Sequence, residues 1–215
     1  DNLLSSAPNS TNAHPHISAS GNLAIIHNGI IENYAVLKKQ LCEYGVEFKS
    51  NTDTEVLVQL IDHIRVTHNV DLLTSVRLAL RSVIGAYAIA ILDKTDPNQI
   101  IAARKSSPLV VGIGDDEFFI GSDASPIIEY TNKVIYLDDG DIAVIRRDQE
   151  VKIVDFDNEE NFRDIKEVEL NLAQIEKDGF PHFMLKEIFE QPSCLKDCMR
   201  RRVNAETNKI LLSAV

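Results

Sequence analysis

Three neighbouring residues have the chemistry needed to bind a negatively charged oxygen. His27-Asn28-Gly29 directly follow the apolar run Leu23–Ile26. An asparagine amide and a glycine backbone N–H can donate to one oxygen, and glycine lets a substrate approach the backbone. Asn-Gly is also the commonest pair in tight hairpin turns. Spacing alone therefore leaves both the oxyanion hole and the turn open, with the turn as the more frequent use.

Asp53 is a second candidate, because it lies in the first turn of a predicted helix. Thr52 and Glu55 have the spacing of a capping box, in which Thr52 caps the helix. One interpretation is that Asp53 complements the positive end of the helix dipole. The other is that its carboxylate, which the cap does not need, binds the ammonium group of a substrate.

His14-Pro15-His16 offers two imidazoles, which are either ordinary loop residues or part of a binding site. A metal centre would need a third ligand. Cys194 and Cys198 have no second ligand pair at a zinc-like spacing, so we predict no metal site. The nucleotide-binding and hydrolase motifs G-x-G-x-x-G, Walker A, G-x-S-x-G and H-E-x-x-H are absent from the sequence, and we predict no cofactor.

The apolar pattern predicts the elements that carry these candidates. A buried strand is expected over 21–27, because the apolar run is short and is followed by Asn28-Gly29. Three helices with apolar stripes should follow: one from Asn33 to Gly45, one opening at Thr52 and one over 71–83.

From Gly85 onward, short apolar runs separated by turn residues indicate strands. Short connections require antiparallel neighbours, and runs that are apolar on both faces should be covered on both, which predicts an α+β layered sandwich. Residues 155–180 indicate an extended linker, and 182–203 a helical pattern interrupted by Pro192. The predicted strands are 86–92, 100–104, 109–113, 117–121, 134–137, 142–145 and 151–154, with a turn at 96–98 and a short helix over 123–130.

Composition argues against some classes of partner. The 215 residues carry a formal net charge of −11, and such a surface repels phosphate backbones and anionic lipids, so neither nucleic acid nor membrane is an expected partner. Three cysteines, an odd number, indicate reduced thiols in a cytoplasmic protein. No apolar window has the length of a membrane-spanning helix, and the N-terminus does not look like a secretory signal.

Together, the motifs resemble one family of enzymes. The match runs from about Ala7 to near Asn204 and is to the glutaminase domain of isomerizing glutamine–fructose-6-phosphate aminotransferases, which are class II glutamine amidotransferases. The stretch Lys186 to Pro192 is the part most particular to this enzyme. In chain order, the motifs lie at 12–16, 27–33, 50–55, 85–88, 104 with 107–110, 121–123, 139–143 and 186–192.

The resemblance implies a fold and a domain organisation. The fold is the N-terminal-nucleophile hydrolase type, a four-layer αββα sandwich of two antiparallel sheets. Residues 1–204 would be the glutamine amidotransferase domain, and 205–215 would begin the linker to a C-terminal sugar-isomerase domain of the same polypeptide. The full-length protein would be a homodimer.

The resemblance also implies an activity and residue roles. The domain would hydrolyse L-glutamine to glutamate and ammonia, and the ammonia would aminate fructose-6-phosphate to glucosamine-6-phosphate. Carried over motif by motif, Asn28 and Gly29 would form the oxyanion hole. Asp53 would bind the α-ammonium of glutamine, His27 would support the loop, and His14 would line the same cleft.

The chain departs from the family at its N-terminal end. The family begins with a catalytic cysteine, whose own α-amino group is the base, and later has an arginine for the substrate carboxylate. Asp1 to Ser6 match neither. We therefore expect an N-terminally truncated domain that is inactive alone and exposes sheet edges. The alternatives are a non-catalytic structural or regulatory homologue, or another class II glutamine amidotransferase of the purine or asparagine branch.

Overall fold

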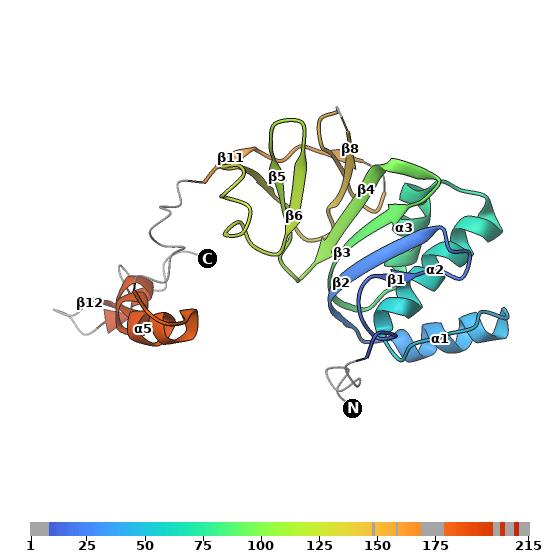
Figure 1. Cartoon of the computed structure of the whole chain (residues 1–215), viewed down its shortest axis with the longest axis horizontal. Helices are drawn as coiled ribbons and strands as arrows, with labels where there is room; N and C mark the ends of the chain where they lie inside the picture. Colours follow the sequence, from blue (N-terminus) through green and yellow to red (C-terminus); the bar gives the residue numbers. More distant parts are fainter. Residues whose placement is uncertain are drawn as a thin grey trace. The chain divides into compact units, whose positions relative to one another are not determined.

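The computed structural model describes residues 9–147, 149–157, 159–168, 179–199, 203–204 and 209–210. The chain forms two compact units, Asp1–Glu169 and Leu170–Val215 (Figure 1). The second unit contains helix α5 (Phe183–Met199) and a short ladder of β12 (Val203–Asn204) with β13 (Lys209–Ile210). The domain boundary expected after residue 204 stays a prediction.

The first unit is built around a seven-stranded antiparallel sheet. Its strand order is β1-β2-β3-β4-β8-β9-β10, so the chain leaves this sheet after β4 and returns at β8. Strands β2 and β3 pair over the whole length of both. The bounds are β1 (His16–Ile17), β2 (Leu23–Ile31), β3 (Gly85–Asp93), β4 (Asp96–Lys105), β8 (Ile142–Arg146), β9 (Lys152–Val154) and β10 (Glu160–Asn161).

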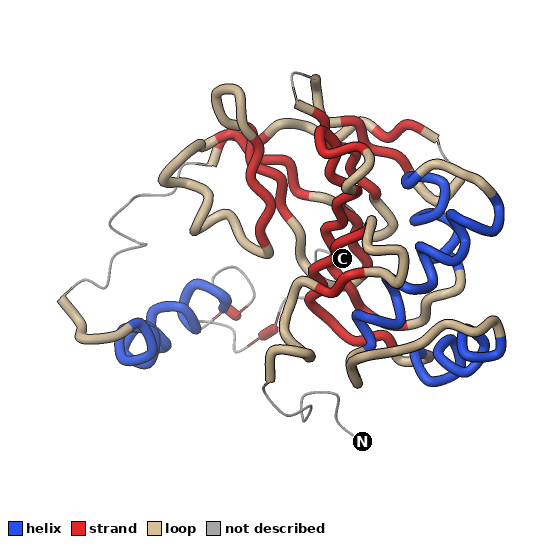
Figure 2. The backbone as a smooth tube through the Cα atoms, turned by 45° about the vertical axis from the view of Figure 1, so that its right-hand side comes forward, coloured by secondary structure: helices blue, strands red, loops and turns tan. Residues whose placement is uncertain are grey.

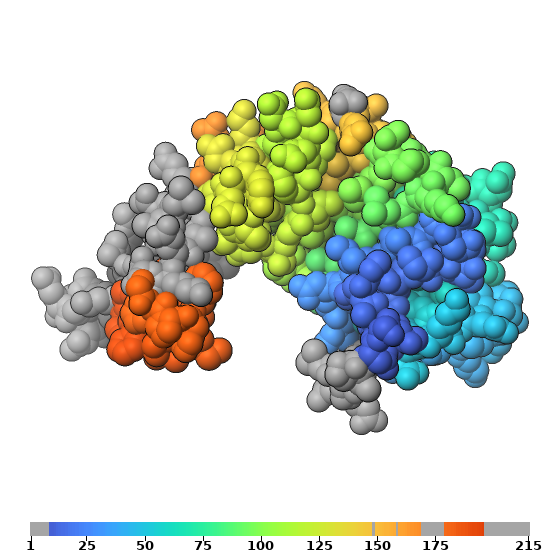
Figure 3. Space-filling model, in the orientation of Figure 1, coloured from blue at the N-terminus to red at the C-terminus, as the bar shows by residue number. Residues whose placement is uncertain are grey.

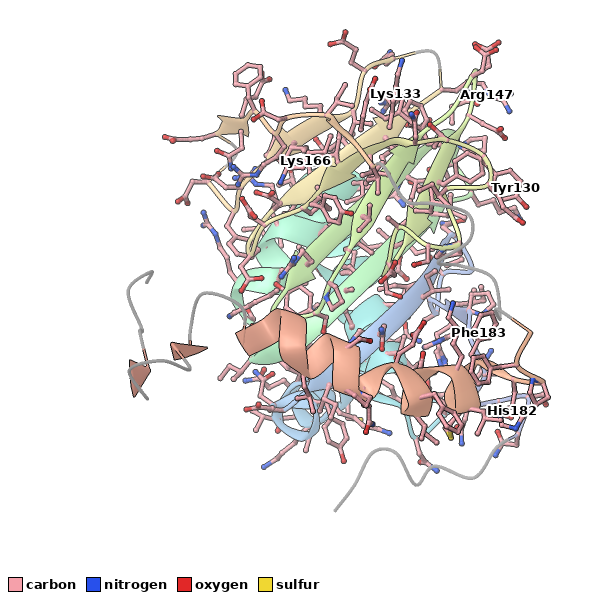
Figure 4. The ribbon with its side chains drawn as sticks, turned by 90° about the vertical axis from the view of Figure 1, so that its left-hand side faces the viewer. Tyr130, Lys133, Arg147, Lys166, His182 and Phe183 are labelled. Carbon is pink, nitrogen blue, oxygen red and sulfur yellow. The ribbon has the colours of Figure 1, made fainter. Side chains whose placement is uncertain are left out.

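A second antiparallel sheet has four strands in the order β11-β7-β5-β6. The edge strand β11 carries Lys166, labelled in Figure 4, whose ammonium lies 5.6 Å from the centre of the Tyr136 ring at the end of β7. The bounds are β5 (Val110–Ile113), β6 (Phe118–Gly121), β7 (Lys133–Tyr136) and β11 (Lys166–Glu167).

Three helices, α1 (Tyr34–Glu43), α2 (Asp53–His68) and α3 (Leu72–Arg81), begin where the sequence predicts. Leu37 and Leu41 are buried on α1, as their spacing indicates. The Thr52 hydroxyl accepts from the backbone N–H of Glu55 and so caps α2. These confirmed signals are local, because a cap and an apolar stripe act within a few residues.

Two apolar cores give the unit its layers (Figure 2). One core lies between the helices and the larger sheet and includes Ile25, Val56 and Tyr87. The other lies between the two sheets and includes Ala102, Val111 and Ile145. Helices on one face of the larger sheet and a second sheet on the other confirm the predicted α+β sandwich. No helix in the described part of the chain has the length and apolarity to cross a membrane.

Three expectations about local structure are wrong. Residues 123–130 form turns instead of a helix: the backbone N–H groups of Ile127 and Tyr130 donate three positions back, and so short a segment does not extend into a regular helix. The predicted turn at 96–98 is the start of β4; the turn lies earlier, where the Asp93 carboxylate accepts from both the N–H and the hydroxyl of Thr95. Helix α5 continues through Pro192. Proline cannot donate one backbone hydrogen bond, and the loss of this single bond does not end the helix.

Residues 155–180 are not all linker, because β10 and β11 add an edge strand to each sheet. Residues 169–178 lie outside the described part of the chain. The capping box at α2 is only half formed. The Glu55 carboxylate accepts from the backbone N–H groups of Lys49 and Ser50 instead of returning to Thr52, which fixes the loop before the helix.

One face of the larger sheet is bare over its first strands. The register places Ile17, Ile26, Ile30 and Leu92 on the same face of the sheet. Paired residues on neighbouring strands share a face, and so do residues an even number of positions apart in one strand. Their exposed fractions are 49%, 50%, 44% and 44%. The smaller sheet covers this face farther along, over β4 and β8, where Ala102, Ala143 and Ile145 are buried against it.

Candidate functional site

The predicted oxyanion residues lie inside a strand and not in a turn. Asn28 and Gly29 belong to β2 and face Ala88 and Tyr87 of β3, so the hairpin interpretation of Asn-Gly is wrong. Gly29 has φ +137°, and a Cβ there would lie 2.1 Å from the Ala86 carbonyl oxygen. Only glycine fits, and its backbone stays open on the exposed side. No described residue forms a hydrogen bond with the side-chain amide of the exposed Asn28, so the N–H donors of this side chain are available for a ligand.

Asp53 joins the end of β2 to the start of α2. Its Oδ2 accepts from the backbone N–H of Ile31 at 2.8 Å, and its Oδ1 lies 3.9 Å from Nδ1 of His27. Asp53 is the first residue of α2, where the helix dipole favours a negative charge. Both interpretations of this residue are thus compatible with its place, since one oxygen is held by the backbone of β2 and the residue lines a cavity.

A threonine hydroxyl connects the two histidines that the sequence singled out. Oγ1 of Thr54 lies 3.0 Å from Nδ1 of His27 and 3.3 Å from Nε2 of His14. Thr54 is buried in the first turn of α2, so the loop before β1, the strand β2 and the helix meet at one oxygen. Sequence reasoning missed Thr54, since its role depends on contacts across 27 and 40 positions of the chain.

A second hydroxyl supports the cap of α2. Oγ1 of Thr52 lies 3.1 Å from Nε2 of His16 and 2.9 Å from the hydroxyl of Ser50, while it accepts from the Glu55 N–H. The backbone donors of Lys49 and Ser50 lower the pKa of the Glu55 carboxyl against the opposing effect of its burial. The start of α2 is therefore fixed by a closed set of hydrogen bonds.

The buried histidines are neutral at pH 7. Burial lowers the pKa of His27 below its usual value, with Asp53 opposing the shift and His14 and His16 adding to it. Burial also lowers the pKa of His16, with His14 acting in the same direction. Nε2 of His27 is buried and has no hydrogen-bond partner among the described residues.

These side chains surround one open cavity of about 210 Å³. Pockets for drug-sized ligands are larger, roughly 300–1,000 Å³, so the space suits a smaller molecule. All five residues predicted for the site line the cavity, and three more were missed by the sequence reasoning. In Figure 3 the blue surface of the chain before and along β2 adjoins the cyan surface of the helices. The lining residues are His14, His27, Asn28, Gly29 and Asp53, with Asn12, Thr52 and Thr54 in addition.

A larger hollow of about 720 Å³ lies elsewhere in the unit, between the ends of the two sheets. Its lining includes Ile113, Phe118 and Ile153 with Arg163, whose guanidinium is held by the Asp141 carboxylate. The Arg163 guanidinium is already paired within the fold, and none of the residues predicted for the site lines this hollow. The smaller cavity is the better candidate for chemistry.

The chain is similar to known proteins over most of its length. The chain is 68% identical over 208 residues to the isomerizing glutamine–fructose-6-phosphate aminotransferase of Bacteroides thetaiotaomicron, which covers 97% of this chain and 34% of the relative. It is 51% identical over 209 residues to the enzyme of the same name from Chlorobaculum tepidum, again 34% of that protein. The chain thus spans about a third of the length of these curated relatives.

Solved structures share the fold. Glutamine phosphoribosylpyrophosphate amidotransferase from B. subtilis, complexed with ADP and GMP, matches 72% of this chain and 34% of its own at 27% identity and a TM-score of 0.60. A structure described as the allosteric regulatory enzyme of purine biosynthesis matches 66% of this chain at 28% identity and a TM-score of 0.54. The family model described as the glutamine amidotransferase domain matches residues 2–129. With a sandwich of the same type and a cavity built from its motif residues, the chain belongs to the glutamine amidotransferase domain family.

Proposed function

We propose that this chain is the glutamine-hydrolysing part of a glucosamine-6-phosphate synthase. The observation that carries the proposal is that Asn28, Gly29 and Asp53 line one cavity of about 210 Å³. Glutamine presents an ammonium group at one end and an amide carbonyl at the other. A carboxylate and two hydrogen-bond donors that line one cavity complement that pair of groups.

In this proposal Asp53 binds the α-ammonium of glutamine. One of its oxygens is held by the Ile31 N–H at 2.8 Å, so the carboxylate is oriented before the substrate arrives. The side-chain amide of Asn28 and the backbone N–H of Gly29 stabilise the negative oxygen that forms when the glutamine amide carbon is attacked. Donors fixed by a strand need no reorganisation during the reaction, which is why such holes are effective.

The attacking thiol comes from outside the cavity lining described here. Cys42 and Cys194 are exposed, and neither borders the cavity. We infer that the nucleophile is the N-terminal cysteine of the longer polypeptide, with its α-amino group as the base. The base takes the thiol proton as the sulfur bonds the amide carbon. The same proton then passes to the leaving nitrogen, and ammonia departs. Water finally releases glutamate from the thioester and restores the thiol.

The acceptor of the ammonia is proposed from the relatives. Identity to the sugar-forming enzymes reaches 68%, against 27% and 28% for the structures of purine biosynthesis, which favours the sugar branch. The longer polypeptide would carry a sugar-isomerase domain that converts fructose-6-phosphate to glucosamine-6-phosphate, and would act as a homodimer in the cytoplasm. Forming glucosamine-6-phosphate from both substrates, followed by mass spectrometry, tests this; glutamate release without an aminated sugar would contradict it.

The oxyanion assignment is tested by Asn28→Ala in the full-length polypeptide. Loss of one oxyanion donor should lower the rate of glutamine hydrolysis by about 10²–10³-fold. Asn98→Ala is the matched control, because Asn98 is exposed and lies away from the cavity. A loss below about threefold for Asn28→Ala, against the range expected for such a donor, would remove Asn28 from the oxyanion hole.

A further inference from the structure

The hydroxyl of Thr54 can donate to only one of its two histidine neighbours at a time. A hydroxyl has a single proton to donate, and each neutral imidazole has one donor and one acceptor nitrogen. Oγ1 contacts Nδ1 of His27 at 3.0 Å and Nε2 of His14 at 3.3 Å. Thr54 cannot donate to both rings, so at least one of the two ring nitrogens must carry a proton and donate it to the hydroxyl oxygen.

The neighbouring carboxylate decides the direction of this chain of hydrogen bonds. Oδ1 of Asp53 lies 3.9 Å from the same Nδ1 of His27. A negative charge favours a proton on the nearer ring nitrogen. His27 therefore donates through Nδ1–H to Thr54, and the proton of the Thr54 hydroxyl stays available for Nε2 of His14. The remaining nitrogen of His27, Nε2, is then an unprotonated acceptor.

We propose that Thr54 is a positioning residue for glutamine hydrolysis: its hydroxyl holds His27 in the Nδ1–H tautomer and one ring orientation. His27 directly precedes Asn28 and Gly29 on β2, so a fixed ring restrains the strand end that carries both oxyanion donors. The role in catalysis rests on the function proposed above. The effect on His27 itself does not, because it follows from the contacts alone.

Thr54 suits this role because it is anchored independently of the histidines. It is 3% exposed and lies in the first turn of α2, whose start is fixed by Thr52 and Glu55. Asp53 has its own anchor in the Ile31 N–H, so loss of the Thr54 hydroxyl should leave the ammonium-binding carboxylate in place. The hydroxyl should therefore affect the turnover rate more than substrate binding.

The first test is nuclear magnetic resonance of the 215-residue chain with ¹⁵N-labelled histidines. In the wild type, long-range proton–nitrogen correlations should show His27 as the Nδ1–H tautomer. Thr54→Val keeps the shape and removes the hydroxyl, so His27 should become a mixture of tautomers, whereas Thr54→Ser should restore the wild-type pattern. A wild-type Nε2–H tautomer, or an unchanged His27 in Thr54→Val, would overturn the proposal.

The second test is kinetic and uses the full-length polypeptide. Thr54→Val should lower kcat for glutamine hydrolysis by about fivefold to tenfold, the equivalent of one lost hydrogen bond, with KM for glutamine within about twofold. Thr54→Ser should recover most of the rate. Thr131→Val, which removes another hydroxyl bonded inside the fold, is the matched control and should keep the wild-type kcat.

The two tests separate the failure of each claim. If the wild-type polypeptide does not hydrolyse glutamine, the proposed function falls, while the resonance experiment still decides whether Thr54 fixes His27. If glutamine is hydrolysed but Thr54→Val keeps the wild-type kcat, or Thr54→Ser is as slow as Thr54→Val, Thr54 has no positioning role. An equal loss in Thr131→Val would show that the effect is one of general destabilisation.

Discussion

His16 and His27 are the residues through which pH should act on the folded chain. Burial lowers the pKa of both, so the unfolded chain binds their protons more readily than the folded chain. The free energy of unfolding should therefore be highest above pH 6.5 and should fall as the pH drops below that value, by at most about 1.4 kcal/mol per pH unit for each histidine. The charged and titratable neighbours that set this balance for His27 are Asp53, His14 and His16.

Urea unfolding of the 215-residue chain, repeated at several pH values, measures this dependence. His27→Gln should reduce the slope below pH 6.5, because the ring that resists protonation is gone. His182→Gln is the control, since His182 is exposed and belongs to the second unit. An unchanged slope in His27→Gln would contradict the assignment of the pH dependence to this ring.

At the same scale, sequence could identify the residues of the site but not the bonds between them. Asn28, Gly29 and Asp53 were recognisable from their types and motifs, and all three line the cavity. The bridge from Thr54 to His14 and His27 was not, because hydrogen bonds across 27 and 40 positions depend on the packing of α2 against β1 and β2. Nothing in the local pattern distinguishes a threonine that caps a helix from one that joins two rings.

Among the elements, α1 shows how a cap residue can serve another purpose. Asn33 occupies the N-cap position but makes no side-chain bond to its helix. Its amide nitrogen instead donates to the Ser82 carbonyl at 2.8 Å, and its Oδ1 accepts from the Ile84 N–H at 3.0 Å. The residue therefore links the start of α1 to the segment between α3 and β3.

This arrangement predicts that Asn33→Ser will not preserve stability. Serine is as good an N-cap as asparagine, but it is too short to hold both backbone groups. Asn33→Ser and Asn33→Ala should both lower the free energy of unfolding by about 1–3 kcal/mol, the range for two lost hydrogen bonds. Urea unfolding of the two variants and the wild type measures this loss. If only Asn33→Ser kept the wild-type free energy of unfolding, the stabilising role of Asn33 would be the capping of α1.

Secondary-structure elements could be predicted from the sequence where their signals are local, but not where they depend on distant pairing. Helix starts and strand positions followed from caps, turn residues and apolar periods, all of which act locally. Asn28-Gly29 was ambiguous because its place inside β2 depends on pairing with β3, more than fifty positions away, which no local signal reports. Residues 123–130 had an apolar pattern suited to a helix, yet formed turns around Pro126.

For the first unit as a whole, the bare face of the larger sheet is the feature with the clearest consequence in solution. Ile17, Ile26, Ile30 and Leu92 share that face and are each about half exposed. Clustered apolar side chains on an open sheet favour association with other surfaces. The 215-residue chain should therefore self-associate as its concentration rises.

Sedimentation velocity over a range of concentrations measures this association. The double variant Ile26→Lys with Leu92→Lys should shift the chain toward monomer, because charges on the face oppose its burial. Val66→Lys is the matched control: Val66 is 70% exposed, but it lies on α2, on the helical side of the unit. Equal effects from the control and the double variant would exclude this face as the contact.

Gly29 and Gly85 are each held as glycine by the backbone of the neighbouring strand. A Cβ on Gly29 would strike the Ala86 carbonyl oxygen at 2.1 Å, and a Cβ on Gly85 would strike the Ile30 carbonyl oxygen at the same 2.1 Å. Each obstacle is main chain, which every amino acid shares, so no second-site mutation can trim it away. Mutation over evolutionary time can thus change the side chains around the proposed oxyanion donors, but the close pairing of β2 with β3 requires glycine at both positions.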